Sequence, residues 1–223
     1  MESIVKNGIL QKEILFFIIL TTIAYLPYKR RTFLEISWFR AFLQSALFVV
    51  GSALLVLPNT DVIVFVYSPV TVGLFLLITA AWLGIPWYVR SFGKKPVEYI
   101  KEYPFRFVVR FEYRVMLMKY FEILFQQAQL LYVFFVLLSF ISYGFYKLLL
   151  FFCFIVFTHF IHICLMPDRK AAIFWLKASV PMGVLFGPLL LSGHVLITTS
   201  IHILAYLFFV SYWFPNAKKW QLL

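Results

Sequence analysis

The sequence predicts an all-α, polytopic membrane protein, a transmembrane helical bundle of about seven spans. Of its 223 residues, 63% are hydrophobic and 13% are charged, whereas soluble domains average about 45–50% apolar and about 25% charged residues. The apolar residues form blocks of roughly 18–25 residues, which is the length that crosses a bilayer. Basic residues flank these blocks, so the net charge of +11 reflects membrane orientation and does not indicate nucleic acid as a partner.

The predicted spans follow one another closely enough to form a single integral-membrane helical domain, residues 1–223. Lys12 and Glu13 interrupt the first span. Pro69 and Pro86 lie in the third, where neighbouring helices can satisfy the backbone groups that a proline leaves unpaired. The sixth contains Pro181, Gly187 and Pro188, which predict a kink. The spans are expected at residues 9–26, 33–57, 66–89, 115–140, 144–166, 171–192 and 195–214.

Basic residues divide unequally between the two sets of connecting segments. One set holds the N-terminal segment, "PNTD", the turn before Lys147 and "SGH", with three basic residues in all. The other set holds "YKRR", residues 90–114, "PDRK" and the C-terminal tail, with fourteen. Because positive loops remain in the cytoplasm, the predicted orientation is N-terminus out and C-terminus in, across the cytoplasmic membrane of the cell. Residues 90–114 alternate basic and aromatic side chains, which suits either contact with anionic lipid headgroups or a solvated loop.

Glu122 is the most unusual residue of the predicted spans. By the span assignment, the other eight acidic residues lie at span ends or in loops. At about 100° per residue, Lys119, Glu122, Gln126 and Gln129 share one narrow stripe of a helix, whereas Gln127 points elsewhere. Ionisable residues within spans face the bundle interior or a wet cavity, so this stripe is a candidate functional site. Alternatively, Glu122 simply pairs with Lys119 one turn away.

Histidines supply a second signal. His159 and His162 lie one turn apart in the fifth span, and His202 lies in the seventh between Thr198 and Tyr206, at four-residue spacing. A buried glutamate with histidines from two other helices can hold a water molecule, and also a divalent metal such as zinc, with glutamate as the base. The alternative is that these histidines are structural hydrogen-bond donors. Histidines on two helices also permit haem ligation or proton-coupled transport.

Two segments resemble motifs of the CPBP family of intramembrane endopeptidases, the CAAX proteases and bacteriocin-processing enzymes. "FEILFQQAQLL" is similar to the family's first motif, in the sense of "EEILFRGFLL". In "LLLSGHVLITTSIHILAY" a glycine-containing turn precedes a histidine by nine residues, here Gly193 and His202. "FIVFTHFIHI" loosely echoes the middle motif, a phenylalanine followed by a histidine. The resemblance covers residues 115–214.

The resemblance implies a membrane-embedded protease that cuts a peptide bond in a peptide or membrane-protein substrate. Carried over by position, Glu122 takes the second glutamate, His159 or His162 the middle histidine and His202 the last. The pattern is altered, because Phe121 stands at the first glutamate and Gln126 at the arginine. Tyr206 stands where asparagine is common and could donate a hydrogen bond to an oxyanion.

These alterations leave two readings of the resemblance. The chain is either a divergent endopeptidase that uses glutamate and histidine, with the metal candidates Glu122, His159, His162 and His202, or a non-catalytic pseudoprotease. In the second reading it acts as an immunity, scaffold or partner-binding membrane protein. In both readings membrane lipid surrounds it.

Overall fold

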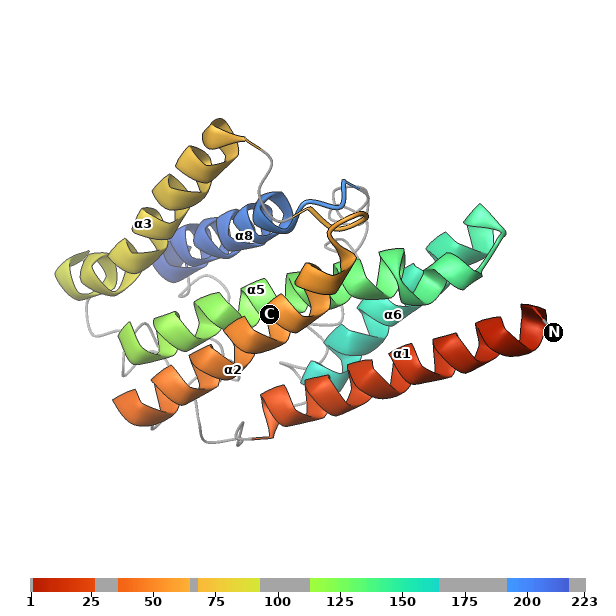
Figure 1. Cartoon of the computed structure of the whole chain (residues 1–223). Helices are drawn as coiled ribbons and strands as arrows, with labels where there is room; N and C mark the ends of the chain where they lie inside the picture. Colours follow the sequence, from red (N-terminus) through yellow and green to blue (C-terminus); the bar gives the residue numbers. More distant parts are fainter. Residues whose placement is uncertain (1, 27–35, 65–67, 93–112, 165–191, 217–223) are drawn as a thin grey trace.

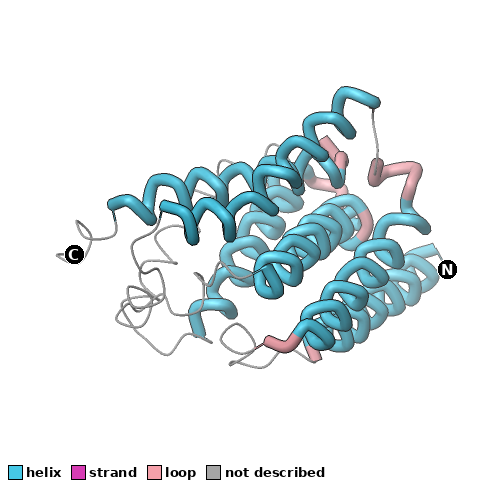
Figure 2. Tube along the Cα trace, turned by 90° about the vertical axis from the view of Figure 1, so that its left-hand side faces the viewer, coloured by secondary structure: helices cyan, strands magenta, loops and turns pink. Residues whose placement is uncertain are grey.

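The computed structural model describes residues 2–26, 36–64, 68–92, 113–164 and 192–216, and these residues are helical apart from short loops (Figures 1 and 2). The six α-helices of this part of the chain keep the labels of Figure 1. They are α1 (Glu2–Tyr25), α2 (Trp38–Val56), α3 (Pro69–Phe92), α5 (Tyr113–Phe135), α6 (Gly144–Cys164) and α8 (Val195–Asn216). Two 3-10 turns follow α2 and α5, at Leu57–Asn59 and Leu137–Phe140.

Each described helix coincides with one predicted span. The predicted span 171–192 and almost all of the segment 90–114 lie outside the described residues. Pro69 occupies the first position of α3, where its missing N–H is not needed, and the helix continues past Pro86. The fourth span is not one uninterrupted helix as expected, because α5 ends at Phe135 and a 3-10 turn completes the segment.

Helices α2 and α5 form the centre of the bundle and pack closely along their length. Gly51 of α2 lets the ring of Phe125 approach its backbone, and that ring stacks on Phe48 with centroids 5.6 Å apart. Phe48 and Phe125 are both completely buried. On the other side of α5, Trp82 of α3 donates a hydrogen bond of 2.9 Å from its indole nitrogen to the carbonyl of Met116.

Two loops meet at the end of the bundle where α2 ends and α8 begins. The Val64 amide donates to the Gly193 carbonyl and the Val195 amide donates to the Val64 carbonyl, each at 2.9 Å. Gly193 has φ of +72°, a conformation that glycine adopts without steric cost. These two loops were predicted on one side of the membrane. In Figure 1 the N-terminus of α1 and the start of α6 lie toward the same end, because α1, α2, α3, α5 and α6 run in alternating directions.

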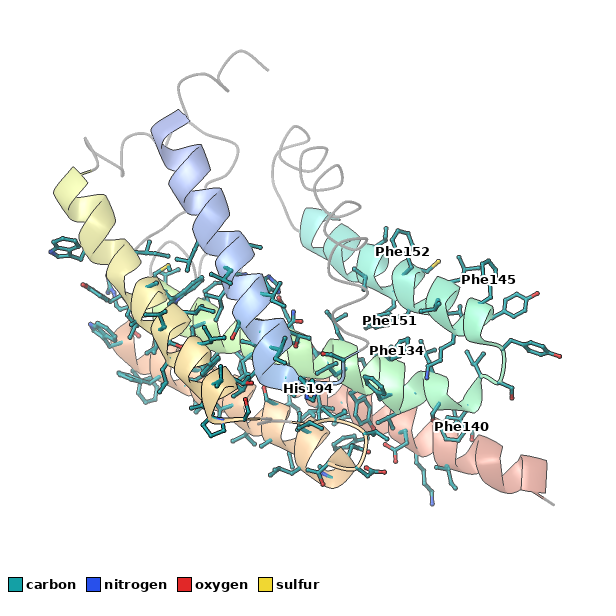
Figure 3. All side chains as sticks on the ribbon, turned by 90° about the horizontal axis from the view of Figure 1, so that it is seen from above. Phe134, Phe140, Phe145, Phe151, Phe152 and His194 are labelled. Carbon is teal, nitrogen blue, oxygen red and sulfur yellow. The ribbon has the colours of Figure 1, made fainter. Side chains whose placement is uncertain are left out.

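The described side chains are distributed as in a membrane protein: many large apolar residues are exposed, and several polar residues are buried within the hydrophobic core. Exposed hydrophobic residues line the outer faces of α1, α2, α3 and the first half of α6, where Figure 3 shows Phe145 projecting away from the bundle. The buried set includes Gln44, Ser45, Ser52, Glu122, Gln127, Gln129, Thr198, Thr199 and Ser200. Three segments, Gly8–Tyr25, Trp38–Asn59 and Tyr113–Phe140, are long and apolar enough to cross a membrane. Buried polar groups and an apolar exterior are what we expect of a helical protein that is surrounded by lipid.

Candidate functional site: a polar seam between α1 and α5

Glu122 lies at the centre of the candidate site and is completely buried. Its two carboxylate oxygens receive different partners. The Lys119 ammonium lies 3.1 Å from Oε2, and the Gln126 side-chain amide donates to Oε1 at 3.2 Å. Lys119 keeps 20% of its side chain exposed. The predicted stripe is therefore real, and its carboxylate is neutralised by the lysine one turn away.

The stripe faces α1. The Gln129 side-chain amide donates to the Thr21 hydroxyl at 2.8 Å. The partly buried Tyr25 lies close to Gln126 and Glu122. Its ring also contacts Phe48 of α2 and Phe125 of α5. We call this set the polar seam, defined as Lys119, Glu122, Gln126, Gln129 and Tyr132 of α5 with Glu13, Thr21 and Tyr25 of α1.

Glu13 belongs to the polar seam although the sequence interpretation placed it at a span end. It lies inside the apolar segment Gly8–Tyr25, and its carboxylate accepts a hydrogen bond from the Tyr132 hydroxyl. Phe17, one turn further along α1, stacks on the Tyr132 ring at 5.8 Å. The signal was present in the sequence, because residues 13, 17, 21 and 25 recur every four positions and so form one ridge of α1.

His202 lies against a different face of α5. Its Nδ1 is 2.8 Å from the side-chain nitrogen of Gln127. Gln127 follows Glu122 by five positions, which is about 140° around the helix. The prediction that Gln127 points away from the stripe is therefore confirmed. Glu122 accepts its described hydrogen bonds from residues of the polar seam. His202 instead contacts α5 on the side that packs against α8.

For the other predicted site residues, the structure describes the position of the backbone but not of the side chain. His159 and His162 lie in the last two turns of α6, and Tyr206 lies in the second half of α8. The side chains of all three lie outside the described residues. A convergence of Glu122 with these histidines is thus untested, and it stays a prediction.

A metal site needs several ligands that converge. Among the described side chains, no group of three or more histidine, cysteine, aspartate or glutamate residues is close enough to hold a metal ion. Zinc in proteins takes at least three protein ligands. The lysine at 3.1 Å also cancels the negative charge of Glu122 that a divalent ion would require. The described residues around Glu122 therefore do not fit a divalent metal.

The chemistry available to the polar seam follows from these contacts. A carboxylate that accepts hydrogen bonds from an ammonium and an amide is held in one orientation. Acting as a general base would require a water molecule to reach one of the remaining lone pairs of this completely buried carboxylate. Hydrogen bonds between helices in a membrane contribute about 0.6–2 kcal/mol each, so the seam also holds α1 to the bundle.

Comparison of the chain with protein-family models, with curated proteins and with solved structures finds no match.

Proposed function

We propose that the chain is a multi-pass protein of the cytoplasmic membrane with seven spans, its N-terminus outside and its C-terminus inside. The fourteen basic residues predicted on one side against three on the other support this orientation. The pairing of the Val64 loop with the Gly193 turn is consistent with it, because both loops belong to the side with few basic residues.

Cysteine labelling tests this topology. The native cysteines Cys153 and Cys164 are first replaced by alanine, and single cysteines are introduced at Asp61 and at Lys95. In intact cells, an impermeant maleimide should label Asp61→Cys and leave Lys95→Cys unlabelled until the membrane is permeabilised. The reverse pattern would refute the orientation, and labelling of both positions in intact cells would refute an odd number of spans between them.

Within this topology we propose a non-catalytic, CPBP-like membrane protein that binds a partner in or at the bilayer, in an immunity or scaffold role. One observation carries this choice over proteolysis. Both Glu122 oxygens are engaged by Lys119 and Gln126, on a face about 140° from the residue that contacts His202. The partner is a peptide or membrane protein, and lipid covers the remaining apolar surface.

A cleavage assay with a matched variant tests the non-catalytic role. Purified chain in detergent or liposomes is incubated with a prenylated peptide and with a peptide library, and the products are identified by mass spectrometry. We expect no product above background from either the unaltered chain or Glu122→Gln. A product that forms with the unaltered chain and disappears with a folded Glu122→Gln protein would overturn the proposal.

A divergent endopeptidase is the second candidate, favoured by one observation. Glu122 is the one charged side chain in the buried set of the described residues, and buried acids within spans are commonly functional. In this case Glu122 would activate water, with His202 and His159 or His162 as partners and Tyr206 as oxyanion donor. Loss of cleavage in His202→Ala as well as Glu122→Gln, with both proteins folded, would establish it.

A further inference from the structure

The corner where the chain passes from α5 into α6 carries a cluster of exposed aromatic rings. Tyr143, Phe145 and Tyr146 keep 74%, 73% and 57% of their surface exposed. The centroid of the Tyr146 ring lies 6.1 Å from that of Tyr143 and 5.9 Å from that of Phe145. Figure 3 shows Phe140 and Phe145 toward this same end of the bundle. Aromatic side chains gather in this way where a bilayer meets water, because they are apolar and tyrosine also carries a polar tip.

The surface of α6 changes in character after this aromatic cluster. Leu148, Leu149 and Leu150 are each close to half exposed, whereas Phe151 and Ile155 are buried against the rest of the bundle. The outer surface of α6 therefore offers rings and hydroxyls at its start and aliphatic side chains further along. A phospholipid presents its headgroup and its acyl chains in the same order.

Lys147 lies between these two zones, and its charge is not balanced by an acid of the described chain. Its ammonium lies over the Phe134 ring, 4.4 Å from the ring centroid. No acidic side chain of the described residues forms an ion pair with it, whereas Lys119 of α5 pairs with Glu122. An ammonium has three N–H donors, and an aromatic ring covers only one side of it. Because charged groups at membrane depth normally pair with an opposite charge, Lys147 is suited to contact an anion from outside the chain.

The two exposed tyrosines lie close to this lysine. The Lys147 amide donates to the Tyr143 carbonyl at 3.1 Å, so Tyr143 lies one helical turn before Lys147. Side chains at this spacing have Cβ atoms about 5–6 Å apart. The hydroxyls of Tyr143 and Tyr146 form no hydrogen bond within the described part of the chain. One ammonium and two hydroxyls at one exposed corner match the several acceptor oxygens of a phosphate group.

We propose that the α5–α6 corner binds an anionic phospholipid. The phosphate lies at the Lys147 ammonium with the hydroxyls of Tyr143 and Tyr146 beside it, and the acyl chains follow the exposed leucines of α6. The ring cluster by itself suits any lipid headgroup region, whereas the lysine selects negative charge. The site requires that the chain lie in a bilayer, but it depends neither on the orientation nor on whether the chain cleaves peptides.

Native mass spectrometry of the purified full-length chain in detergent tests the site. The chain is titrated with phosphatidylglycerol, which is anionic, or with phosphatidylcholine, which contains the same phosphate but has no net charge. The unaltered chain should bind phosphatidylglycerol about five-fold more tightly, the factor expected for one lysine near an anionic lipid surface. Lys147→Met should lose this preference. Lys12→Met is the matched control, because Lys12 is exposed on another helix and its replacement removes the same charge, and it should leave the preference unchanged.

These titrations can overturn the proposal in three ways. It is wrong if the unaltered chain binds both lipids equally, if Lys147→Met keeps the preference, or if Lys12→Met loses as much of it.

A second measurement on the unaltered chain does not depend on whether Lys147→Met folds. Phosphatidylglycerol that carries a photoreactive diazirine near the start of an acyl chain should crosslink to residues 143–150, and an excess of unlabelled phosphatidylglycerol should suppress this labelling. Crosslinks that spare these residues, or labelling that phosphatidylcholine suppresses equally well, would contradict the site.

Discussion

Replacing Gly51 by alanine tests the contact on which the centre of the bundle depends. A Cβ atom at Gly51 would lie 2.6 Å from Cε2 of Phe125, whereas ordinary contacts of this kind begin at 3.4 Å. The phenylalanine ring must therefore retreat by roughly 0.8 Å, the difference between these two distances. It is completely buried and lies between the rings of Phe48 and Tyr25, so it has no free direction in which to move.

The magnitude follows from two opposing terms. Overpacking a filled core costs about 1–3 kcal/mol, and replacing glycine by alanine within a helix returns about 1 kcal/mol. Gly84→Ala isolates the second term, because a Cβ atom added at Gly84 of α3 would meet nothing within 4 Å. We expect Gly51→Ala to be less stable than Gly84→Ala by about 1–3 kcal/mol, which lowers the unfolding midpoint by about 2–12 °C.

Thermal unfolding of the purified variants in one detergent measures this difference. The double variant Gly51→Ala with Phe125→Leu provides an internal check, because a smaller side chain at residue 125 relieves the contact and should recover part of the loss. If Gly51→Ala proved as stable as Gly84→Ala, the close approach of α2 and α5 at this glycine would be wrong. The contact of the Tyr25 ring with Phe125 would then lose its support as well.

Three further predictions concern individual contacts. A double-mutant cycle of Thr21→Val and Gln129→Leu should give a coupling energy of about 0.6–2 kcal/mol by denaturant unfolding, and additive effects would contradict the hydrogen bond between α1 and α5. Gly193→Ala should destabilise the fold by about 1–2 kcal/mol because its φ is positive and its Cβ would lie 3.0 Å from the Val62 carbonyl; no loss would place this turn in another conformation. Trp82→Phe should cost about 0.5–1.5 kcal/mol by removing the indole hydrogen bond to the Met116 carbonyl and should alter near-ultraviolet dichroism, whereas an unchanged stability would exclude this bond.

The sequence predicted the helices well because bilayer thickness constrains their length. All six described α-helices correspond to apolar blocks, since a spanning segment must be both long and uniformly apolar. The stripe of Glu122 and Gln126 was equally predictable, because helical periodicity alone decides which residues share a face. The end of α5 at Phe135 was not predictable, because Val136 and the residues after it are as apolar as those before.

Helical periodicity could not predict which residues of other helices contact the stripe. A helical wheel gives the direction of a side chain relative to its own helix, but not which helix it meets. Glu122 was expected to face the histidine-bearing spans, yet its described contacts lie along α5 and toward α1. The residue that meets His202 is Gln127, which was set aside as pointing elsewhere.

Helix α1 is attached to the described bundle largely through polar side chains. Most of its apolar surface faces outward, and its Gly8–Tyr25 segment buries far fewer residues than the α5 segment does. What attaches it to α5 is a ridge of Glu13, Thr21 and Tyr25, together with ring contacts to Tyr132 and Phe125. Lipid competes for apolar contacts but not for hydrogen bonds, so polar side chains specify the position of such a helix.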